Sequence, residues 1–360
     1  MKIAILTLFD SYASNFGNKL QNYAAEKVYS SLGYEVQTLV RDNPVTAYER
    51  IKNRVKQLIN FVSGYRLSAG QNDWRRFDAF WSFNDRRLHI RYLTDSEDLR
   101  MTEYDYYSVG SDQVWNPLWL KTKDDERWFL LENVPESKRL CMSASFGVEK
   151  IPEDKKDVFI EALNGFGSIS VREDTGRLIV KDLINREAEV LVDPTLAIDK
   201  SEWEMIEKRP KRFSDEAYIL CYFLGGIAQE DWTSMVRFAE INHCKIYDIM
   251  DHKSDLFGIG PEEFLWLIHH SSCVLTDSFH GCVFSIIYGK SFFAFKRKGR
   301  NDYMFSRIET LLGKFNLLDR VVDNSIDIIS KDLATEYDVS NKLLLERDKF
   351  WDYFKKQLGK

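Results

Sequence analysis

Short apolar runs alternate with amphipathic stretches along most of the chain, and this pattern predicts strands that alternate with helices. At the N-terminus, residues 2–9 form a β-favouring run, residues 10–18 form a polar loop, and residues 19–32 show apolar or small residues at helical spacing. Gly33 ends the predicted helix, and residues 34–40 form the next predicted strand. This order is typical of a βαβ unit in a parallel sheet.

Further apolar runs in the first half each end in a small, polar segment, and we interpret them as strands at residues 106–109, 139–144, 169–173 and 189–195. Side chains that follow the carboxyl ends of parallel strands line the crevice where open α/β sheets bind ligands. The polar segments after these strands are therefore candidate binding loops.

The same alternation restarts in the second half. The predicted strands there are residues 218–224, 245–249, 273–276 and 291–295, and the predicted helices are 231–242, 261–269 and 282–288. This pattern predicts a second doubly wound α/β unit.

The chain has 360 residues, which is more than one hydrophobic core usually supports, so we expect two domains. Pro194 interrupts the pattern and a charged stretch follows it to Lys211, which places the boundary close to residue 200. We expect two Rossmann-like α/β domains that face each other across a cleft, one over residues 1–199 and one over residues 200–335.

Two segments depart from the alternation. The stretch of about 44–100 is crowded with Arg, Lys, Trp and Phe, and we interpret it as a helical insertion that caps one side of the first domain. The end of the chain, residues 336–360, holds one long amphipathic helix, predicted over residues 341–358.

Composition narrows the class of protein. Hydrophobic residues make up 44% and charged residues 29% of the chain, which is within the globular range. The net charge of −6 argues against nucleic acid as a partner, because phosphate contacts need clustered excess Lys and Arg. The N-terminal apolar run is too brief for a signal peptide, and no run reaches transmembrane length. We expect a cytoplasmic protein without a transmembrane segment, for which peripheral membrane contact stays open.

The sequence lacks the motifs that would indicate a metal or a nucleotide. The five cysteines are scattered and never stand at metal-ligand spacing. Neither Gly17-Asn18-Lys19 nor Gly225-Gly226 matches a dinucleotide-binding or P-loop pattern, and no HExxH or GxSxG occurs. We therefore expect no metal and no cofactor.

His280 is the most informative single residue. It follows the strand predicted at residues 273–276, precedes an apolar helix and stands next to Gly281. Glycine lets the backbone approach a ligand, and a helix N-terminus favours an anion, so we expect the imidazole to project into the cleft. The alternative is a histidine that caps the helix or fills the core.

Arg172 ends a predicted strand in the other half, where its guanidinium could grip a carboxylate or a phosphate with two hydrogen bonds. An ion pair with Glu173 or Asp174 on a solvated turn explains the residue equally well. The loop after the strand at residues 106–109 offers further hydrogen-bonding side chains, namely Ser111, Asp112 and Gln113.

Basic residues recur after the last predicted strand of the second half. Lys298 and Arg300 are interpreted as a solvated face, as a run of like charges usually is. Arg297 and Arg307 are better placed for a site, because they lie close to the strand end and to the helix start that follow His280.

Together these motifs resemble the polysaccharide pyruvyl transferase family. The matching residues extend from the N-terminus to about residue 320, and their order is more specific than any one of them. They are Gly17-Asn18-Lys19-Leu20-Gln21-Asn22, Gly110-Ser111-Asp112-Gln113-Val114-Trp115-Asn116, Ser145-Phe146-Gly147, Ser170-Val171-Arg172-Glu173, Asp193-Pro194-Thr195, Thr276-Asp277-Ser278-Phe279-His280-Gly281 and Ser306-Arg307-Ile308.

The resemblance implies an architecture similar to that of GT-B glycosyltransferases, and a reaction in which the enolpyruvyl group of phosphoenolpyruvate becomes a ketal on a sugar. It implies that Arg172 and His280 contact this donor, with His280 suited to act as the general acid, and that Asn18 is among the binding residues. The implied partners are phosphoenolpyruvate and a glycan acceptor, with a lipid-linked acceptor left open.

One residue departs from the family pattern. Many members carry Arg-Leu-His-Gly where this chain has Ser278-Phe279-His280-Gly281, so that Ser278 replaces a donor-binding arginine. We keep Ser278 among the candidate substrate-binding residues. We expect Arg297 or Arg307 to supply the missing cation.

Two other functions stay open from the sequence. A glycosyltransferase with the same two-domain fold would use an activated sugar donor, and a non-catalytic binding protein is compatible with Ser278. One fold hosts many reactions, so the fold does not separate these alternatives.

Overall fold

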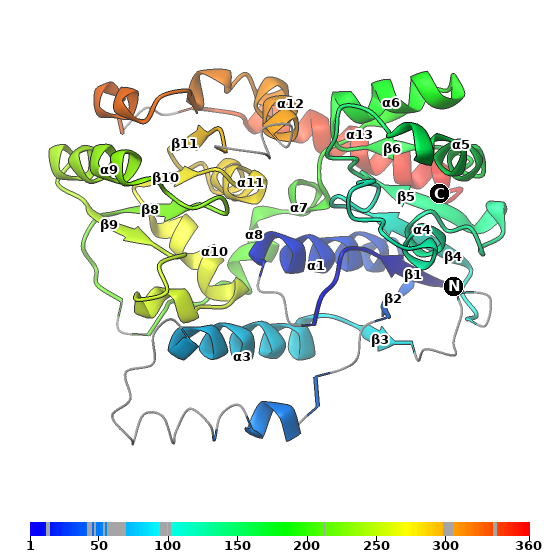
Figure 1. Cartoon of the computed structure of the whole chain (residues 1–360), viewed down its shortest axis with the longest axis horizontal. Helices are drawn as coiled ribbons and strands as arrows, with labels where there is room; N and C mark the ends of the chain where they lie inside the picture. The colour runs from blue at the N-terminus through cyan, green and yellow to red at the C-terminus, as the bar shows by residue number, and fades with distance from the viewer. Residues whose placement is uncertain are drawn as a thin grey trace.

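Two parallel β-sheets, each accompanied by helices, form the two halves of the molecule (Figure 1). The computed structural model describes residues 1–11, 15–41, 45–46, 48–52, 55, 70–93, 99, 102–211, 213–297, 305–333 and 337–360. The prediction of an α/β protein with two Rossmann-like domains is confirmed.

The first sheet has the strand order β3-β2-β1-β4-β5, and every neighbouring pair is parallel. β6 and β7 pair with each other and continue this sheet through a parallel bridge between Ala144 and Val171. The strands are β1 (Lys2–Leu6), β2 (Glu35–Val40), β3 (Ile90–Tyr92), β4 (Tyr106–Gly110), β5 (Arg139–Met142), β6 (Ser170–Val171) and β7 (Glu189–Val190). The helices of this half include α1 (Phe16–Ser31), α4 (Lys123–Phe129), α5 (Lys156–Asn164) and α6 (Asp174–Ile184).

The second sheet has the order β12-β11-β10-β8-β9 and is also entirely parallel. The chain passes from β8 to β9 on one side and then to β10 on the other, so a switch point lies at the carboxyl ends of β8 and β10. The strands are β8 (Tyr218–Tyr222), β9 (Lys245–Asp248), β10 (Cys273–Thr276), β11 (Phe292–Phe295) and β12 (Val321–Val322). The helices are α9 (Gln229–Ile241), α10 (Pro261–His270), α11 (Phe279–Tyr288) and α12 (Ser306–Phe315).

Two helices begin three residues earlier than their apolar patterns predicted. α1 begins at Phe16 because the side chain of Asn15 caps it, and α11 begins at Phe279 because Ser278 caps it. Each cap accepts a hydrogen bond from a backbone N–H three residues further on, which satisfies a donor that the helix leaves without a partner. As a result, His280 lies in the first turn of α11.

Helix α3 (Gly70–Arg87) lies between the two halves. Phe80 packs against the aromatic ring at the start of α1, with ring centroids 5.1 Å apart, and Arg87 pairs with Glu262 of α10 at 2.9 Å. The stretch interpreted as a helical cap on the first domain, residues 44–100, thus contacts both domains. It also contains strand β3, which that interpretation omitted.

Helix α13 (Ser340–Gln357) returns from the second half to the first, where the C-terminus lies (Figure 1). Arg347 fixes it there by donating to the backbone oxygens of Leu196 and Ile198, at 2.7 Å in each case. Like every other helix in the described part of the chain, α13 is too short or too polar to cross a membrane.

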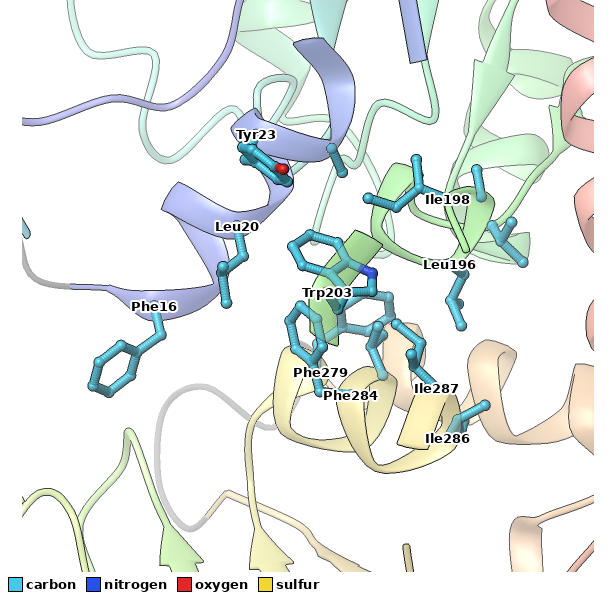
Figure 2. Close-up of a cluster of buried hydrophobic side chains, with 14 of the residues drawn as sticks. Phe16, Leu20, Tyr23, Leu196, Ile198, Trp203, Phe279, Phe284, Ile286 and Ile287 are labelled. Carbon is cyan, nitrogen blue, oxygen red and sulfur yellow. The ribbon is translucent and has the colours of Figure 1, made fainter. Parts of the chain in front are cut away.

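A shared apolar cluster joins the two halves (Figure 2). Side chains of α1, α7 (Pro194–Ala197), α8 (Lys200–Glu204) and α11 meet around Trp203, whose ring centroid lies 5.6 Å from that of Tyr23 and 5.0 Å from that of Phe284. Because burial of apolar surface is the dominant favourable term in folding, this cluster fixes α1 against α11. It thereby positions the polar residues that both helices carry at their N-termini.

Candidate active site

Asp193 is the centre of a buried group of polar side chains where the two domains meet. It caps α7, and its Oδ1 accepts hydrogen bonds from the backbone N–H and the hydroxyl of Thr195, at 3.0 and 2.7 Å. Its Oδ2 accepts from Ser111 Oγ at 2.9 Å and from Arg172 Nη1 at 2.8 Å. Both oxygens of this fully buried carboxylate therefore have partners, as a buried charge requires.

Arg172 follows β6 and is held between two carboxylates. In addition to its bond with Asp193, its Nη2 lies 3.4 Å from Asp112 Oδ1, and its guanidinium stacks over the ring of Phe279 at 4.4 Å. Burial alone lowers the pKa of Arg172, but the charges of Asp193 and Asp112 outweigh it and raise the pKa. Arg172 is 3% exposed, so the alternative of an ion pair on a solvated turn is wrong.

Asp112 joins the group from the loop after β4. Its φ of 67° lies in the left-handed region, which Asp adopts more readily than most residues. Oδ1 accepts from the backbone N–H of Gln113 at 2.9 Å, and Oδ2 lies 3.4 Å from Nδ2 of Asn18 in α1. Burial by itself raises the pKa of Asp112, but the charges of Arg172 and then His280 outweigh it and lower the pKa.

Arg307 enters from α12 of the second domain and meets Gln113 of the first. When the amide oxygen of Gln113 faces Arg307, it accepts hydrogen bonds from both terminal guanidinium nitrogens, at 2.9 and 3.1 Å. Burial and then the charge of Arg172 lower the pKa of Arg307 to about 10, although Asp112 acts in the opposite direction. Arg297 also lowers this pKa. Arg307 is thus a poorly solvated cation next to other cations, which favours an anion beside it.

His280 brings α11 into the same group. Its Nε2 lies 3.8 Å from Oδ2 of Asp193, the oxygen that also binds Arg172. Its ring packs directly on Gly17 of α1, where an added Cβ would lie 2.1 Å from His280 Nδ1. His280 Nε2 and Arg172 Nε are buried, and neither has a hydrogen-bond partner among the described residues. Such nitrogens are rare in protein interiors and are suited to bind a ligand.

The neighbours of Asp193 control its ionisation. Burial by itself raises the pKa of this carboxyl group, but the proximity of His280 and then of Arg172 outweighs burial and holds the pKa well below its usual range. Asp193 therefore stays ionised at neutral pH. A carboxylate in this position can orient the imidazole of His280.

Arg297 and Ser278 lie beside the group instead of within it. Arg297 follows β11 and donates from Nε to Asp277 Oδ2 at 2.9 Å and from Nη2 to Asp277 O at 3.3 Å. Ser278 caps α11, and its backbone N–H donates to Thr276 Oγ1 at 3.0 Å. Ser278 thus positions the start of the helix that carries His280.

Glu173 supports the group from the first domain. Its Oε1 accepts hydrogen bonds from Ser145 Oγ at 2.9 Å, from Phe146 N at 2.8 Å and from Gly147 N at 3.2 Å. Gly147 has a φ of 60° and leaves no room for a Cβ, which would lie 2.2 Å from the side-chain amide of Gln113. This network links the Ser145-Phe146-Gly147 loop to the segment that carries Arg172 and Glu173.

The structure brings together most of the side chains that the sequence pattern indicated. Those around Asp193 are Asn18, Ser111, Asp112, Gln113, Arg172, His280 and Arg307. Asp193, Thr195 and Glu173 were not predicted as site residues. A signal for Asp193 was present, because a carboxylate directly after the apolar residues 190–192 and before a proline is typical of a buried helix cap.

A different group could hold a metal ion. The donor atoms of Glu207, His269 and His270 all lie within 4.8 Å of one another in the described part of the chain. His269 Nδ1 is 2.9 Å from Glu207 Oε2. This group includes none of the residues around Asp193.

The comparison with models of protein families assigns the chain to a family. The sequence model of the family described as polysaccharide pyruvyl transferase matches residues 15–299. The chain belongs to this family. The match covers the residues of the site from Asn18 to His280, whereas Arg307 lies beyond it.

Other comparisons with known proteins are less informative. No curated protein matches this chain. Among solved structures, a mutant of S. aureus TarM in complex with Fondaparinux, alpha-GlcNAc-glycerol and UDP is 11% identical with a TM-score of 0.49, and the alignment covers 100% of both chains. The UDP-GlcNAc 2-epimerase of Methanocaldococcus jannaschii is 10% identical with a TM-score of 0.46, over 98% of this chain and 100% of the other. The UDP-GlcNAc 2-epimerase of Neisseria meningitidis is 11% identical with a TM-score of 0.45, over 98% of this chain and 93% of the other. These neighbours do not select a substrate.

Proposed function

We propose that this chain transfers the enolpyruvyl group of phosphoenolpyruvate to a pair of hydroxyl groups on a sugar, forming a pyruvate ketal during surface polysaccharide biosynthesis. Membership of the polysaccharide pyruvyl transferase family supports the transfer of a pyruvyl group. The observation that carries the choice of donor is the convergence of Arg172, Arg307 and His280 from both domains on one buried region.

The charges of the site suit a small, strongly anionic donor. Phosphoenolpyruvate has a carboxylate and a phosphate, each of which needs a fixed cation. Arg307 would bind one of these anions, because burial and then the charge of Arg172 lower its pKa to about 10, and an anion beside it offsets both effects. Arg172 Nε supplies a further buried donor. Arg307 thus stands in for the arginine that Ser278 replaces.

His280 is the acid in this proposal. It donates a proton from Nε2 to the methylene carbon of the donor, while one sugar hydroxyl adds to the neighbouring carbon. The proton that this hydroxyl loses restores the acid form of His280. The carbon–oxygen bond to phosphate then breaks, and its electron pair leaves with the phosphate. The second hydroxyl adds to the same carbon, and its proton balances the released phosphate. The products are the ketal and inorganic phosphate.

The remaining residues position these groups. Asp193 holds Arg172 directly and lies beside His280, so it fixes the cation and the acid relative to each other across the domain junction. The arginines stabilise charge as it develops on the leaving phosphate. His280 is 7% exposed and Arg172 is 3% exposed, so the site is shielded from bulk water in this structure. The scheme requires no metal or nucleotide.

The test is phosphate release from phosphoenolpyruvate in the presence of candidate acceptors, including lipid-linked glycans. Phosphoenolpyruvate should also raise the melting temperature of the protein, because any ligand that prefers the native state stabilises it. Stabilisation by sugar nucleotides but not by phosphoenolpyruvate would contradict the proposal and favour glycosyl transfer.

A further inference from the structure

A cavity of about 330 Å³ lies at the carboxyl ends of the strands in the second sheet. Its walls come from the segments that follow β8, β10, β11 and β12, together with the first turn of α9. This is the switch point of the sheet, where open α/β sheets commonly bind ligands. The donor groups around Asp193 lie at the domain junction, so the cavity offers a second binding region.

Asp277 joins this cavity to the candidate active site. It lines the cavity, and its two carboxylate oxygens accept hydrogen bonds from the backbone N–H groups of Leu224 at 2.6 Å and Gly225 at 2.8 Å. The next residue, Ser278, caps the helix that carries His280. A ligand that rests against Asp277 therefore lies beside the N-terminus of α11.

The walls combine aromatic rings with carboxylate–cation pairs. Phe223 and Phe295 meet edge to face with ring centroids 5.3 Å apart, and Lys296 pairs with Asp323 at 2.8 Å. Asp231 adds a carboxylate from α9. Sugar hydroxyl groups both donate and accept hydrogen bonds, and the C–H faces of a sugar pack on aromatic rings. This lining therefore suits a polyhydroxylated ring.

The charges of the lining disfavour a phosphate. The described lining residues include more carboxylates than cations. The carboxylates are Asp231, Asp277 and Asp323, and the cations are Lys296 and Arg297. Asp231 lies in the first turn of α9, where the helix dipole would otherwise favour an anion. The cations are paired with Asp323 and Asp277.

We infer that this cavity binds the acceptor as an uncharged sugar residue, beside the N-terminus of the helix that carries His280. The role as acceptor site rests on the proposed function. The binding of a sugar in this place does not depend on phosphoenolpyruvate, so the two ideas can fail separately.

The first experiment fills the cavity. Ala228 lines it, whereas the next residue, Gln229, is exposed and is not part of the lining, so Ala228→Trp and Gln229→Trp form a matched pair. Methyl β-galactopyranoside and methyl β-glucopyranoside are titrated by saturation-transfer NMR. At least one should bind the wild type and Gln229→Trp, and should bind Ala228→Trp about tenfold more weakly or worse. Phosphoenolpyruvate should bind all three proteins with affinities that agree within about twofold, which also shows that they are folded.

The second experiment tests the chemistry of the lining. Asp231→Asn removes a lining carboxylate, and Glu230→Gln removes its exposed neighbour in the same turn. Asp231→Asn should weaken sugar binding about tenfold, because hydrogen bonds to charged groups are the stronger ones, while Glu230→Gln should leave it unchanged. Sodium pyrophosphate should not displace the sugar. Displacement by pyrophosphate, or equal sugar binding to wild type and Ala228→Trp, would overturn the inference.

The outcomes also separate this inference from the proposed function. If a methyl hexoside binds in the cavity and phosphoenolpyruvate does not bind at all, the proposed function fails and the sugar site stands. If phosphoenolpyruvate binds and neither methyl hexoside binds, the cavity is not the acceptor site and the donor chemistry stands.

Discussion

The contact between Gly17 and His280 offers the sharpest test of how the two domains build the site. A Cβ added at Gly17 would lie 2.1 Å from Nδ1, 2.4 Å from Cγ and 2.8 Å from Cβ of His280. Because the Cβ of His280 is itself too close, turning the imidazole alone does not relieve the clash. Gly17→Ala must therefore move His280 away from α1, by more than about 1 Å if ordinary contact distances are to be restored.

The expected magnitudes follow from this displacement. Overpacking of a well-filled site usually costs about 1–3 kcal/mol, and replacement of a helical glycine by alanine returns roughly 0.5–1 kcal/mol. The free energy of unfolding should therefore fall only modestly. Activity should fall much further, because a misplacement of about 1 Å at a reacting group can cost about 100-fold in rate.

The assay compares kcat for phosphate release from phosphoenolpyruvate with thermal stability for the wild type, Gly17→Ala and Gly313→Ala. Gly313 is the matched control, because it lies within α12 and a Cβ there would have no described atom outside the helix backbone within 4 Å. Gly313→Ala should keep wild-type kcat and equal or higher stability. If Gly17→Ala folds and retains wild-type kcat, activity does not require His280 to be held against α1, and this reasoning is refuted.

Other predictions concern the acid and the charged partners. His280→Gln should lower kcat by about two to four orders of magnitude with little change in donor affinity; a parallel collapse of affinity in calorimetry would show that His280 only binds the donor. In heavy water the wild type should place deuterium in the ketal methyl group, and an unlabelled methyl group would contradict proton addition. Arg172→Lys keeps the charge but removes Nε, the buried nitrogen that has no partner among the described residues, so the Kd for phosphoenolpyruvate should rise about tenfold; an unchanged Kd would show that Arg172 does not bind the donor. Asp193→Asn should lower the free energy of unfolding by about 3–5 kcal/mol near neutral pH, because it leaves Arg172 buried without its closest carboxylate. The pKa of Asp193 is lower in the folded than in the unfolded protein, so its stabilisation is complete above the unfolded value of about 3.8 and is lost as the pH falls below it. The stability difference between wild type and Asp193→Asn should therefore shrink in that acidic range, and a difference that stays constant down to pH 2 would argue against this ionisation.

The sequence pattern predicted the elements that have a clear periodicity. The strands that open each half and the helices between them were expected because several apolar residues mark each of them. β12 (Val321–Val322) is only two residues long and carries no periodic signal. β3 (Ile90–Tyr92) lies in a stretch rich in basic and aromatic residues, where its pairing with β2 decides its conformation.

The starts of α1 and α11 depended on side chains outside the apolar pattern. Asn15 and Ser278 cap these helices and extend them toward the site, which places Asn18 and His280 in first turns instead of in loops. Asn and Ser are common caps, so the signal was present in the sequence. The spacing of apolar residues alone does not reveal these caps.

By itself, the sequence determined which polar groups stand at the carboxyl ends of strands, and this identified Asp112, Arg172 and His280. Only the tertiary structure decided that Asp193 binds Arg172 and faces His280 from the other domain, and that Arg307 approaches Arg172 from α12. The physical reason is that Coulomb interactions and desolvation depend on distance and burial, and residues far apart in the chain acquire both only when the domains pack.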